Sequence, residues 1–349
     1  MPSFRTGRVV QLLSSRRGLQ RVEVELGAGA TERAHVLTDL VGPVAEGDEV
    51  VVNTTAVALG LGTGGWHVVH WNLSRREWIS EGGGHVMKLR YTSLQTDTGV
   101  AEEDPAYRPP ADLGGRPVVA CLLHSQLPCV AAAFSAGAPG KRLVHVMSDA
   151  GALPLALSDV VAGLEGAGLL AATVTAGHAF GGDHEAVNLP SALDVAVAAA
   201  GADVIVVAPG PGVVGTGTAK GFSGLDVAAI IDAAAIADGR PLVAVRFSES
   251  DPRPRHRGVS HHVTTALGRA HHRALVPIPV GEWPDPLPPE LEIHELQAVE
   301  GIPDVDRLLR QAGLAVTTMG RSAHDDPAFF RWSAAAGTLA AHLAVSSRP

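Results

Sequence analysis

The chain has 349 residues, of which 46% are hydrophobic and 18% charged, and its formal net charge at pH 7 is −9. This composition can bury a large core and argues against intrinsic disorder, while the acidic balance argues against general nucleic-acid binding. Cys121 and Cys129 are the only cysteines, too few for a disulfide framework or a cysteine-based zinc site.

No leader-like apolar segment follows Met1, and no run of about 18 apolar residues occurs. We therefore expect a soluble, cytoplasmic protein with no membrane partner. The length is typical of two domains. The sequence leaves the oligomeric state open, a homo-oligomer included.

Residues 1–95 show short apolar or alternating segments separated by glycine-containing turns, a pattern typical of a small all-β barrel or sandwich. His67 and His70 are three residues apart and would point to opposite faces of one strand, so we do not expect them to share a metal ion. The predicted strands are 5–13, 19–26, 33–40, 49–53 (continued or followed by 54–59), 66–71 and 86–91.

A polar stretch rich in proline and glycine, 96–117, predicts a linker. From 118 to 349, strands alternate with helices, which indicates a doubly wound, mostly parallel sheet covered on both faces. The predicted strands are 118–123, 143–147, 169–175, 204–208, 242–247, 274–279, 292–296 and 314–318. The predicted helices are 126–137, 155–166, 190–200, 225–237, 305–313 and 328–345. The expected fold class is α/β with a smaller, barrel-like N-terminal domain.

A glycine-rich loop, residues 210–221, follows the predicted strand 204–208. Glycines let a backbone adopt conformations that side chains forbid, and the free N–H groups of such a loop can surround an anion. A structural crossover loop is the alternative, although loops longer than roughly 12–15 residues are usually functional or disordered. No Walker A motif is present, and Pro211 removes one N–H from the Gly-x-Gly-x-x-Gly spacing. The expected ligand-binding residues of the loop are Gly210, Gly212, Gly215, Thr216, Gly217, Thr218 and Lys220.

Polar and titratable residues also follow the other predicted strands. The carboxyl ends of parallel strands share one edge, where such sheets bind ligands, so these loops predict a site there. The loops are 124–128, 148–154, 177–188, 210–221 and 248–262.

Two chemistries fit this edge. In the first, Asp149, His178 and Asp183 are catalytic, and His178, Asp183 and His184 hold a divalent metal such as zinc, manganese or iron, which could activate water. Asp149 and one of His261 or His262 could complete that metal site. The spacing matches no established metal motif, and the alternative is that these histidines are hydrogen-bonded structural residues and that Asp183 caps a turn.

In the second chemistry, the glycine-rich loop and a basic segment hold a phosphate or carboxylate, because arginine offers these groups planar, bidentate geometry. Arg255 is the expected anion ligand, with Arg253 and Arg257 beside it. His261 and His262 would follow a capping serine in the first turn of a helix, where either could act as a general acid or base. A solvated basic loop is the alternative.

Four segments, 147–154, 177–188, 210–218 and 251–262, resemble the signature stretches of an uncharacterised bacterial family, domain-of-unknown-function family 3866. The resemblance covers nearly the whole chain. It implies no activity, substrate or cofactor.

The residues therefore predict binding of a small anionic ligand, a nucleotide or phosphorylated metabolite among the candidates, with metal- or His/Asp-assisted hydrolysis or group transfer if the chain is an enzyme. The alternative is a non-catalytic metabolite sensor or assembly module. A serine hydrolase is disfavoured, because no Gly-x-Ser-x-Gly elbow occurs. A dinucleotide-dependent oxidoreductase lacks a convincing ribose-binding acidic residue.

Overall fold

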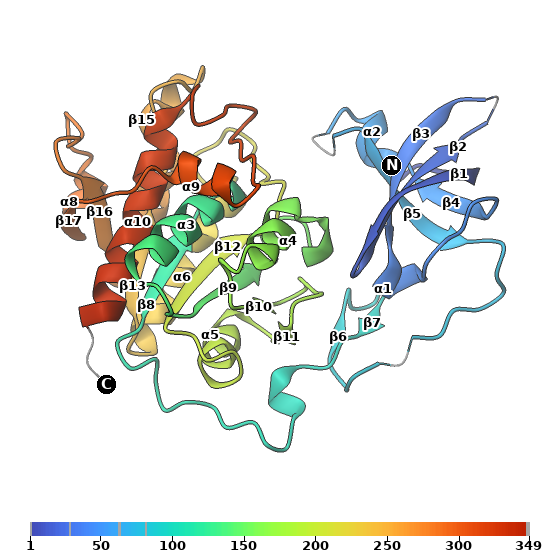
Figure 1. Cartoon of the computed structure of the whole chain (residues 1–349), viewed down its shortest axis with the longest axis horizontal. Coiled ribbons are helices and arrows are strands. Elements are labelled where there is room, and N and C mark those ends of the chain that lie inside the picture. Colours follow the sequence, from blue (N-terminus) through green and yellow to red (C-terminus); the bar gives the residue numbers. More distant parts are fainter. Residues whose placement is uncertain (1, 28, 62–63, 81, 347–349) are drawn as a thin grey trace. The chain divides into compact units, whose positions relative to one another are not determined.

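The computed structural model describes residues 2–27, 29–61, 64–80 and 82–346. The chain divides into two compact units, Met1–Gly99 and Val100–Pro349 (Figure 1). Each unit has its own buried apolar cluster. Among the described residues, no helix has both the length and the apolar character that crossing a bilayer requires.

The first unit is a closed five-stranded barrel. Alternate residues of the second and fourth strands point inward, and a set of valines, such as Val22, Val24, Val50 and Val52, is fully buried there. In barrel order the strands are β1 (Phe4–Arg16), β2 (Leu19–Glu25), β3 (Thr31–Leu37), β5 (Trp66–Asn72) and β4 (Glu49–Asn53). The predicted barrel is therefore confirmed.

Two predicted strands of this unit differ from the structure. Residues 54–59 contain a short helix, α2 (Thr55–Ala58), and not the end of a strand. Of 86–91, only β6 (Met87–Lys88) is a strand, paired with β7 (Thr96–Asp97). A short helix, α1 (Thr38–Val41), ends the third strand. The two histidines of β5 have separate surroundings: His67 is buried against Glu32, and His70 packs edge-on against Phe4.

The second unit contains an eight-stranded, wholly parallel sheet. Its central strands are continuous runs of valine, isoleucine and alanine that are buried along their length, as expected for strands covered on both faces. In spatial order the strands are β11 (His184–Glu185), β10 (Ala172–Thr175), β9 (Leu143–Ser148), β12 (Val204–Pro209), β8 (Pro117–Cys121), β13 (Arg240–Ala244), β16 (Leu275–Pro279) and β17 (Glu295–Val299).

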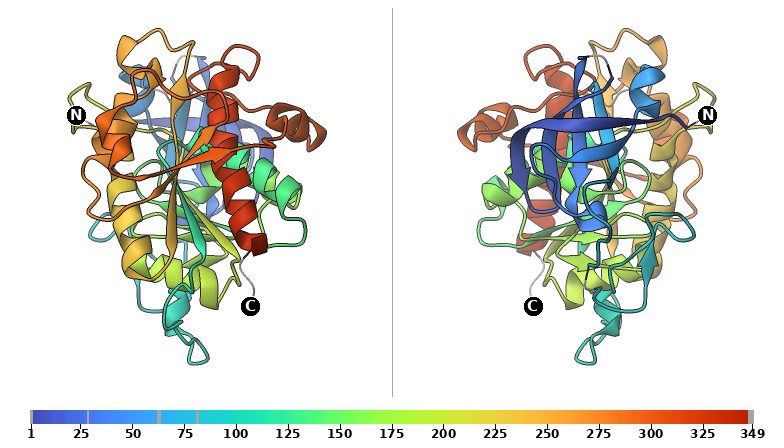
Figure 2. Two further views of the ribbon diagram at one scale, coloured as in Figure 1. Left: turned by 90° about the vertical axis from the view of Figure 1, so that its left-hand side faces the viewer. Right: turned by 90° about the vertical axis from the view of Figure 1, so that its right-hand side faces the viewer.

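Helices pack in two layers, one on each face of this sheet (Figure 2). One layer contains α3 (Leu127–Gly137), α4 (Asp159–Gly166), α9 (Val305–Gln311) and α10 (Pro327–Ser346). The other contains α5 (Leu189–Ala198), α6 (Val227–Ile236), α7 (His261–Leu267) and α8 (Pro289–Glu292). The predicted doubly wound α/β fold is therefore confirmed.

Other segments of this unit also differ from expectation. Residues 314–318 form no strand and contribute a single bridge between Thr318 and Arg321. Within 96–117, the expected linker, Leu113 is fully buried in the α/β core. Its N–H donates to the carbonyl of Ala237 at 2.7 Å, so the end of this segment belongs to the second unit.

The strand order creates a switch point between β12 and β8. From β8 the chain passes through α3 to β9, whereas from β12 it passes through α6 to β13, on the opposite face and in the opposite direction. Loops that leave two neighbouring strands in opposite directions open a crevice at their carboxyl ends, where ligands bind in this class of sheet. The glycine-rich loop begins at this crevice, directly after β12.

Two glycines allow α3 and α10 to pack closely. A Cβ atom on Gly337 would lie 2.2 Å from the carbonyl oxygen of Val130, and one on Gly137 would lie 2.9 Å from the Cβ of Ala341. We expect Gly337→Ala to lower the free energy of unfolding by about 1–3 kcal/mol, because the helices must move apart. Urea denaturation tests this, with Gly166→Ala in α4 as a control, since nothing lies within 4 Å of a Cβ there. Equal stability of the two variants would contradict the expectation.

Candidate functional site

Gln126 ties the carboxyl ends of β8 and β13 together. Its side-chain oxygen accepts the N–H groups of Leu122 and Leu123, at 2.9 and 3.1 Å, and its amide nitrogen donates to the carbonyl of Ala244 at 2.7 Å. The side chain is completely buried. It therefore fixes the floor of the crevice.

His124 bridges the same floor to its neighbours. Its Nδ1 lies 2.9 Å from the carbonyl oxygen of Pro209, at the end of β12, and its Nε2 lies 2.7 Å from Ser158 Oγ. Burial lowers the pKa of His124 more than the Pro209 carbonyl raises it. The imidazole is therefore neutral at pH 7, and both of its nitrogens are hydrogen-bonded.

Asp149 and His178 meet at this edge, as the sequence predicts. A carboxylate oxygen of Asp149 accepts the backbone N–H of His178 at 2.9 Å. Gly177 has a φ of +65°, and a Cβ there would lie 2.3 Å from that oxygen. Burial, and then the charge of Asp149, raise the pKa of Asp226 at the start of α6.

The loop that carries Asp149 packs directly on the glycine-rich loop. A Cβ on Gly151 would lie 2.2 Å from the oxygen of Gly210, and one on Gly210 would lie 2.1 Å from the oxygen of Ala152. The N–H of Ala152 also donates to the oxygen of Pro211 at 2.8 Å. These positions need glycine because the two backbones are in contact.

The outer part of the glycine-rich loop is a hairpin. Gly215 and Phe222 form an antiparallel bridge, and the N–H of Thr216 donates to the oxygen of Gly221 at 2.7 Å. The hydroxyls of Thr216 and Thr218 lie 3.0 Å apart. Residues exposed at its tip are Thr216, Gly217, Thr218, Ala219 and Lys220. The loop is therefore folded, with hydroxyl and ammonium groups at its surface.

Arg255 joins this hairpin to the basic segment. Its guanidinium donates to the oxygen of Gly217 and, through Nε, to His256 Nε2, both at 3.4 Å. These are long hydrogen bonds from an exposed side chain, so they are readily exchanged for bonds to a ligand.

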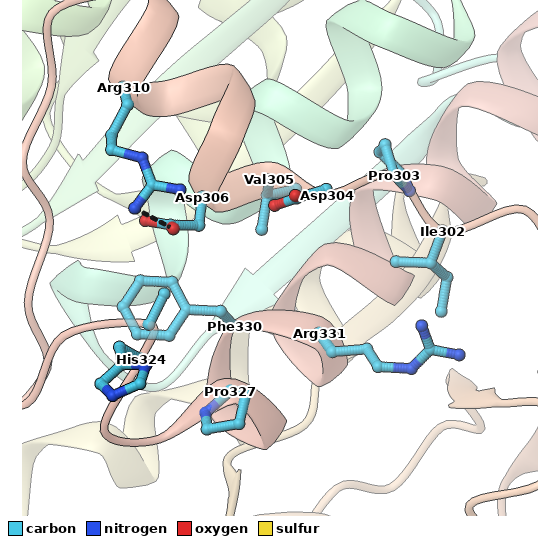
Figure 3. A pocket seen from close by; sticks show the side chains of 11 residues that line it. Ile302, Pro303, Asp304, Val305, Asp306, Arg310, His324, Pro327, Phe330 and Arg331 are labelled. Carbon is cyan, nitrogen blue, oxygen red and sulfur yellow. Dashed lines mark ion pairs between the residues drawn. The ribbon is translucent and has the colours of Figure 1, made fainter.

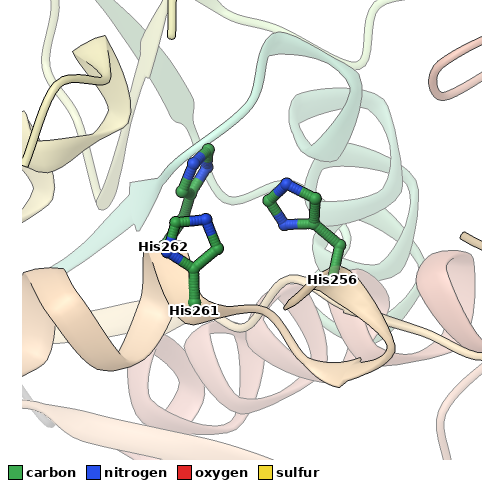
Figure 4. A group of neighbouring side chains, drawn as sticks. All are labelled: His256, His261 and His262. Atoms are coloured by element: carbon green, nitrogen blue, oxygen red, sulfur yellow. The ribbon is translucent and has the colours of Figure 1, made fainter. Parts of the chain in front are cut away.

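Three histidines, His256, His261 and His262, form a cluster (Figure 4), and Arg255 donates to the first of them. The ring centroid of His256 lies 5.0 Å from that of His261 and 4.8 Å from that of His262, and the last two lie 4.4 Å apart. Phe222 stacks on His262 with centroids 3.8 Å apart and an interplanar angle of 6°. Ser260 caps α7 by accepting the N–H of His262, so the predicted serine cap is present. The hairpin base and α7 thus hold these rings together.

A buried network of arginines and carboxylates supports the cluster. Asp251, with no exposed surface, pairs with Arg253 at 2.9 Å, Arg321 at 3.3 Å and Arg246 at 3.4 Å. Arg321 also pairs with Asp326 at 3.1 Å. Together with Arg255, this network contains four arginines but only two carboxylates, those of Asp251 and Asp326. Positive charge is therefore in excess next to the histidines.

The histidines of the cluster remain neutral at pH 7. Burial, followed by the charge of Arg246, lowers the pKa of His256 and of His262 to about 3. Burial and then Arg255 lower the pKa of His261 as well. Neutral imidazole nitrogens can accept a proton or ligate a metal.

The residues expected to bind a metal lie elsewhere along the edge. His184 is in the edge strand β11, and Asp183 uses one carboxylate oxygen to accept the N–H and the hydroxyl of Thr173, both at 3.0 Å. Within the described part of the chain, His178, Asp183 and His184 form no three-ligand group; the one such group is His256, His261 and His262. These two hydrogen bonds attach Asp183, the residue before β11, to β10, so its carboxylate points toward β10.

A pocket of about 480 Å³ lies between α9 and the start of α10 (Figure 3). Three of its polar side chains bond within the protein: Asp304 caps α9, and Asp306 pairs with Arg310 at 2.5 Å. None of the site residues expected from the sequence lines it. The pocket is therefore a separate feature of this unit.

The profile of the family described as "Protein of unknown function (DUF3866)" matches residues 33–337. The chain belongs to this family. The match runs from β3 of the barrel to α10 of the α/β unit and so includes every residue of the site. No curated protein and no solved structure matches the chain.

Several residues of the site escaped the sequence analysis. His256 lay inside the expected loop 248–262, but nothing in its spacing separated it from the other histidines. Phe222 and Asp251 were not among the expected site residues, because nothing in their local spacing marks them. Arg246 lies just beyond β13 but inside the predicted strand 242–247, and a charge there was a usable signal, because charged residues in such apolar segments are rarely buried unless paired.

Proposed function

We propose that the α/β unit binds a small anionic ligand containing a phosphate or carboxylate group. The ligand would lie at the carboxyl edge of the sheet, between the tip of the glycine-rich loop and the histidine cluster. The observation that carries this proposal is the excess positive charge around Arg255, beside neutral imidazoles. Lys220 at the tip of the hairpin, Arg255, His261 and His262 would be the ligand-binding side chains.

The physical argument rests on desolvation. Arg246 is almost completely buried, and its charge is only partly balanced by Asp251, which it shares with two other arginines. An incoming anion would offset this excess in a setting where ionic interactions are stronger than in water. Arginine also binds phosphate and carboxylate groups bidentately.

Acid–base chemistry at the same edge is a second candidate. Burial, followed by the charge of Asp149, raises the pKa of Asp226, and a carboxyl group of raised pKa is a candidate general acid. His/Asp-assisted hydrolysis or group transfer would use Asp149, Asp226 and His178. A non-catalytic metabolite sensor would need only the anion site.

Calorimetric titration of chelator-treated protein with inorganic phosphate and with ATP tests the binding proposal. We expect Arg255→Ala to weaken binding by about tenfold or more, because a hydrogen bond to a charged group contributes roughly 1.5–3 kcal/mol. Arg310→Ala, which removes an exposed arginine on α9, should leave the affinity unchanged. No binding of either anion, or equal affinity of both variants and the parent, would refute the proposal.

Turnover separates the enzyme from the sensor. Asp149→Asn should abolish hydrolysis of a phosphate ester while anion affinity is retained if the chain is a hydrolase. A sensor would bind the anion without turnover in either form.

A further inference from the structure

We propose that His256, His261 and His262 form a binding site for a first-row transition-metal dication of the zinc class, which binds together with the anionic ligand. The anion in this inference rests on the proposed function. The metal does not, because it depends on the three imidazoles alone.

The geometry of the cluster is close to that of a three-histidine site. One nitrogen from each ring lies within 4.8 Å of the others. Zinc binds histidine nitrogens at about 2.0–2.1 Å, which places tetrahedral ligand atoms roughly 3.4 Å apart. The ligand nitrogens must therefore approach one another by up to about 1.4 Å, the difference between 4.8 Å and 3.4 Å.

The existing hydrogen bonds indicate the ligand atom of His256. Its Nδ1 lies 2.7 Å from Ser260 Oγ, which can accept a hydrogen bond, so Nε2 is the candidate ligand atom. His262 Nδ1 accepts from a guanidinium nitrogen of Arg246 at 3.3 Å, and because a guanidinium only donates, this bond must break before His262 binds a metal. An oriented hydrogen bond on the second nitrogen is usual in metal-binding histidines. Arg255 Nε, now 3.4 Å from His256 Nε2, must move away, which its exposed side chain permits.

A ring nitrogen of His261 also supports a metal site. Its Nε2 is buried and has no hydrogen-bond partner among the described residues. A buried polar atom without a partner costs roughly 1–3 kcal/mol. Ligation of a metal would satisfy this nitrogen, which otherwise has no role in holding the loop.

The surrounding charge explains why the metal and the anion should bind together. A dication would enter a region that already has an excess of positive charge from Arg246, Arg253 and Arg255. Three histidines leave at least one coordination position open, as in catalytic zinc sites. An anion in that position would offset the charge, so each ligand should raise the affinity for the other by the same factor.

Co²⁺ titration of the tag-free, full-length protein tests this inference, because cobalt bound by three histidines in low coordination absorbs visible light. We expect one saturable Co²⁺ site per chain, with at least tenfold higher affinity in the presence of inorganic phosphate. His261→Ala, which alters a partly exposed residue, should abolish the absorption band. His271→Ala, in an exposed histidine that bonds Asp232, is the matched control and should keep it.

Removing the Ser260 hydroxyl should weaken metal binding without removing a ligand. Ser260→Ala removes the hydroxyl that orients His256, and the loss of such a supporting bond typically weakens metal binding by about 10- to 100-fold. Ser260→Thr should restore affinity, because threonine keeps the hydroxyl and also caps helices. Thermal unfolding without metal checks that each variant is folded.

The outcomes distinguish the two proposals. Absence of a saturable cobalt band with phosphate present, or an unchanged band in His261→Ala, overturns the metal site even if phosphate binds to the metal-free protein. A cobalt band that phosphate does not affect, in a chain that binds no anion, supports the metal site and overturns the proposed function.

Discussion

Asp251→Asn is expected to lower the free energy of unfolding of the α/β unit by about 3–5 kcal/mol, because it breaks a buried ion pair by removing one partner. Asp251 has no exposed surface, and Arg246 beside it is almost completely buried. Asparagine keeps the shape of the side chain but leaves the charges of Arg246, Arg253 and Arg321 without their shared partner. Urea denaturation followed by the helical circular dichroism signal measures the loss, since nearly all helices belong to this unit.

Asp306→Asn is the control for that experiment. It removes the carboxylate of an exposed pair with Arg310 on α9, where an ion pair contributes only about 0–1 kcal/mol. A loss at Asp251 no greater than at Asp306 would show that the network does not stabilise the fold.

The acid dependence of the same network has a defined sign. Burial raises the pKa of Asp251, but the hydrogen bonds and charge of Arg253, with the charge of Arg246, outweigh it and hold the pKa well below the usual range. A carboxyl whose pKa is lowered by folding stabilises the protein above its unfolded value of about 3.9, and this contribution is lost as the pH falls below that value. Asp251 therefore stabilises the fold fully at neutral pH.

His145 is expected to make the α/β unit sensitive to mild acid. The ring is completely buried in β9, with Nδ1 3.2 Å from the oxygen of Val206 and Nε2 without a partner among the described residues. Burial, followed by the charge of His124, lowers its pKa to about 3. Because the unfolded chain takes up a proton near pH 6.5, this residue stabilises the fold fully above that pH, and the contribution is lost as the pH falls toward 3.

The expected size follows from the pKa difference. Between pH 6.5 and 4.5 the loss due to His145 is roughly 3 kcal/mol, at 1.36 kcal/mol for each pH unit. His145→Leu should therefore lose roughly 3 kcal/mol less than the parent when the pH is lowered from 7.5 to 4.5. Urea denaturation at the two pH values measures this, and the groups common to both proteins cancel in the comparison. Equal acid dependence would mean that His145 accepts a proton inside the fold.

The two-part architecture could be predicted from the pattern of residues alone. Short apolar runs rich in β-branched residues, such as 204–208, favour strands covered on both faces, and their alternation with helices indicates a parallel sheet. Because the carboxyl ends of parallel strands share one edge, the sequence also placed Asp149, His178 and the glycine-rich loop together. The strand predictions for short or irregular segments such as 54–59 and 314–318 were wrong, because local propensity competes with packing in such segments.

The tertiary structure decided which residues meet. Phe222 stacks on His262 only because the glycine-rich loop folds back as a hairpin, and His256 joins the two adjacent histidines only because 248–260 turns on itself. Asp183 fits a metal ligand by residue type, yet it bonds Thr173 in the neighbouring strand. Such contacts depend on loop conformations set by hydrogen bonds and charge pairs between distant segments, and a single sequence does not encode them in any local spacing.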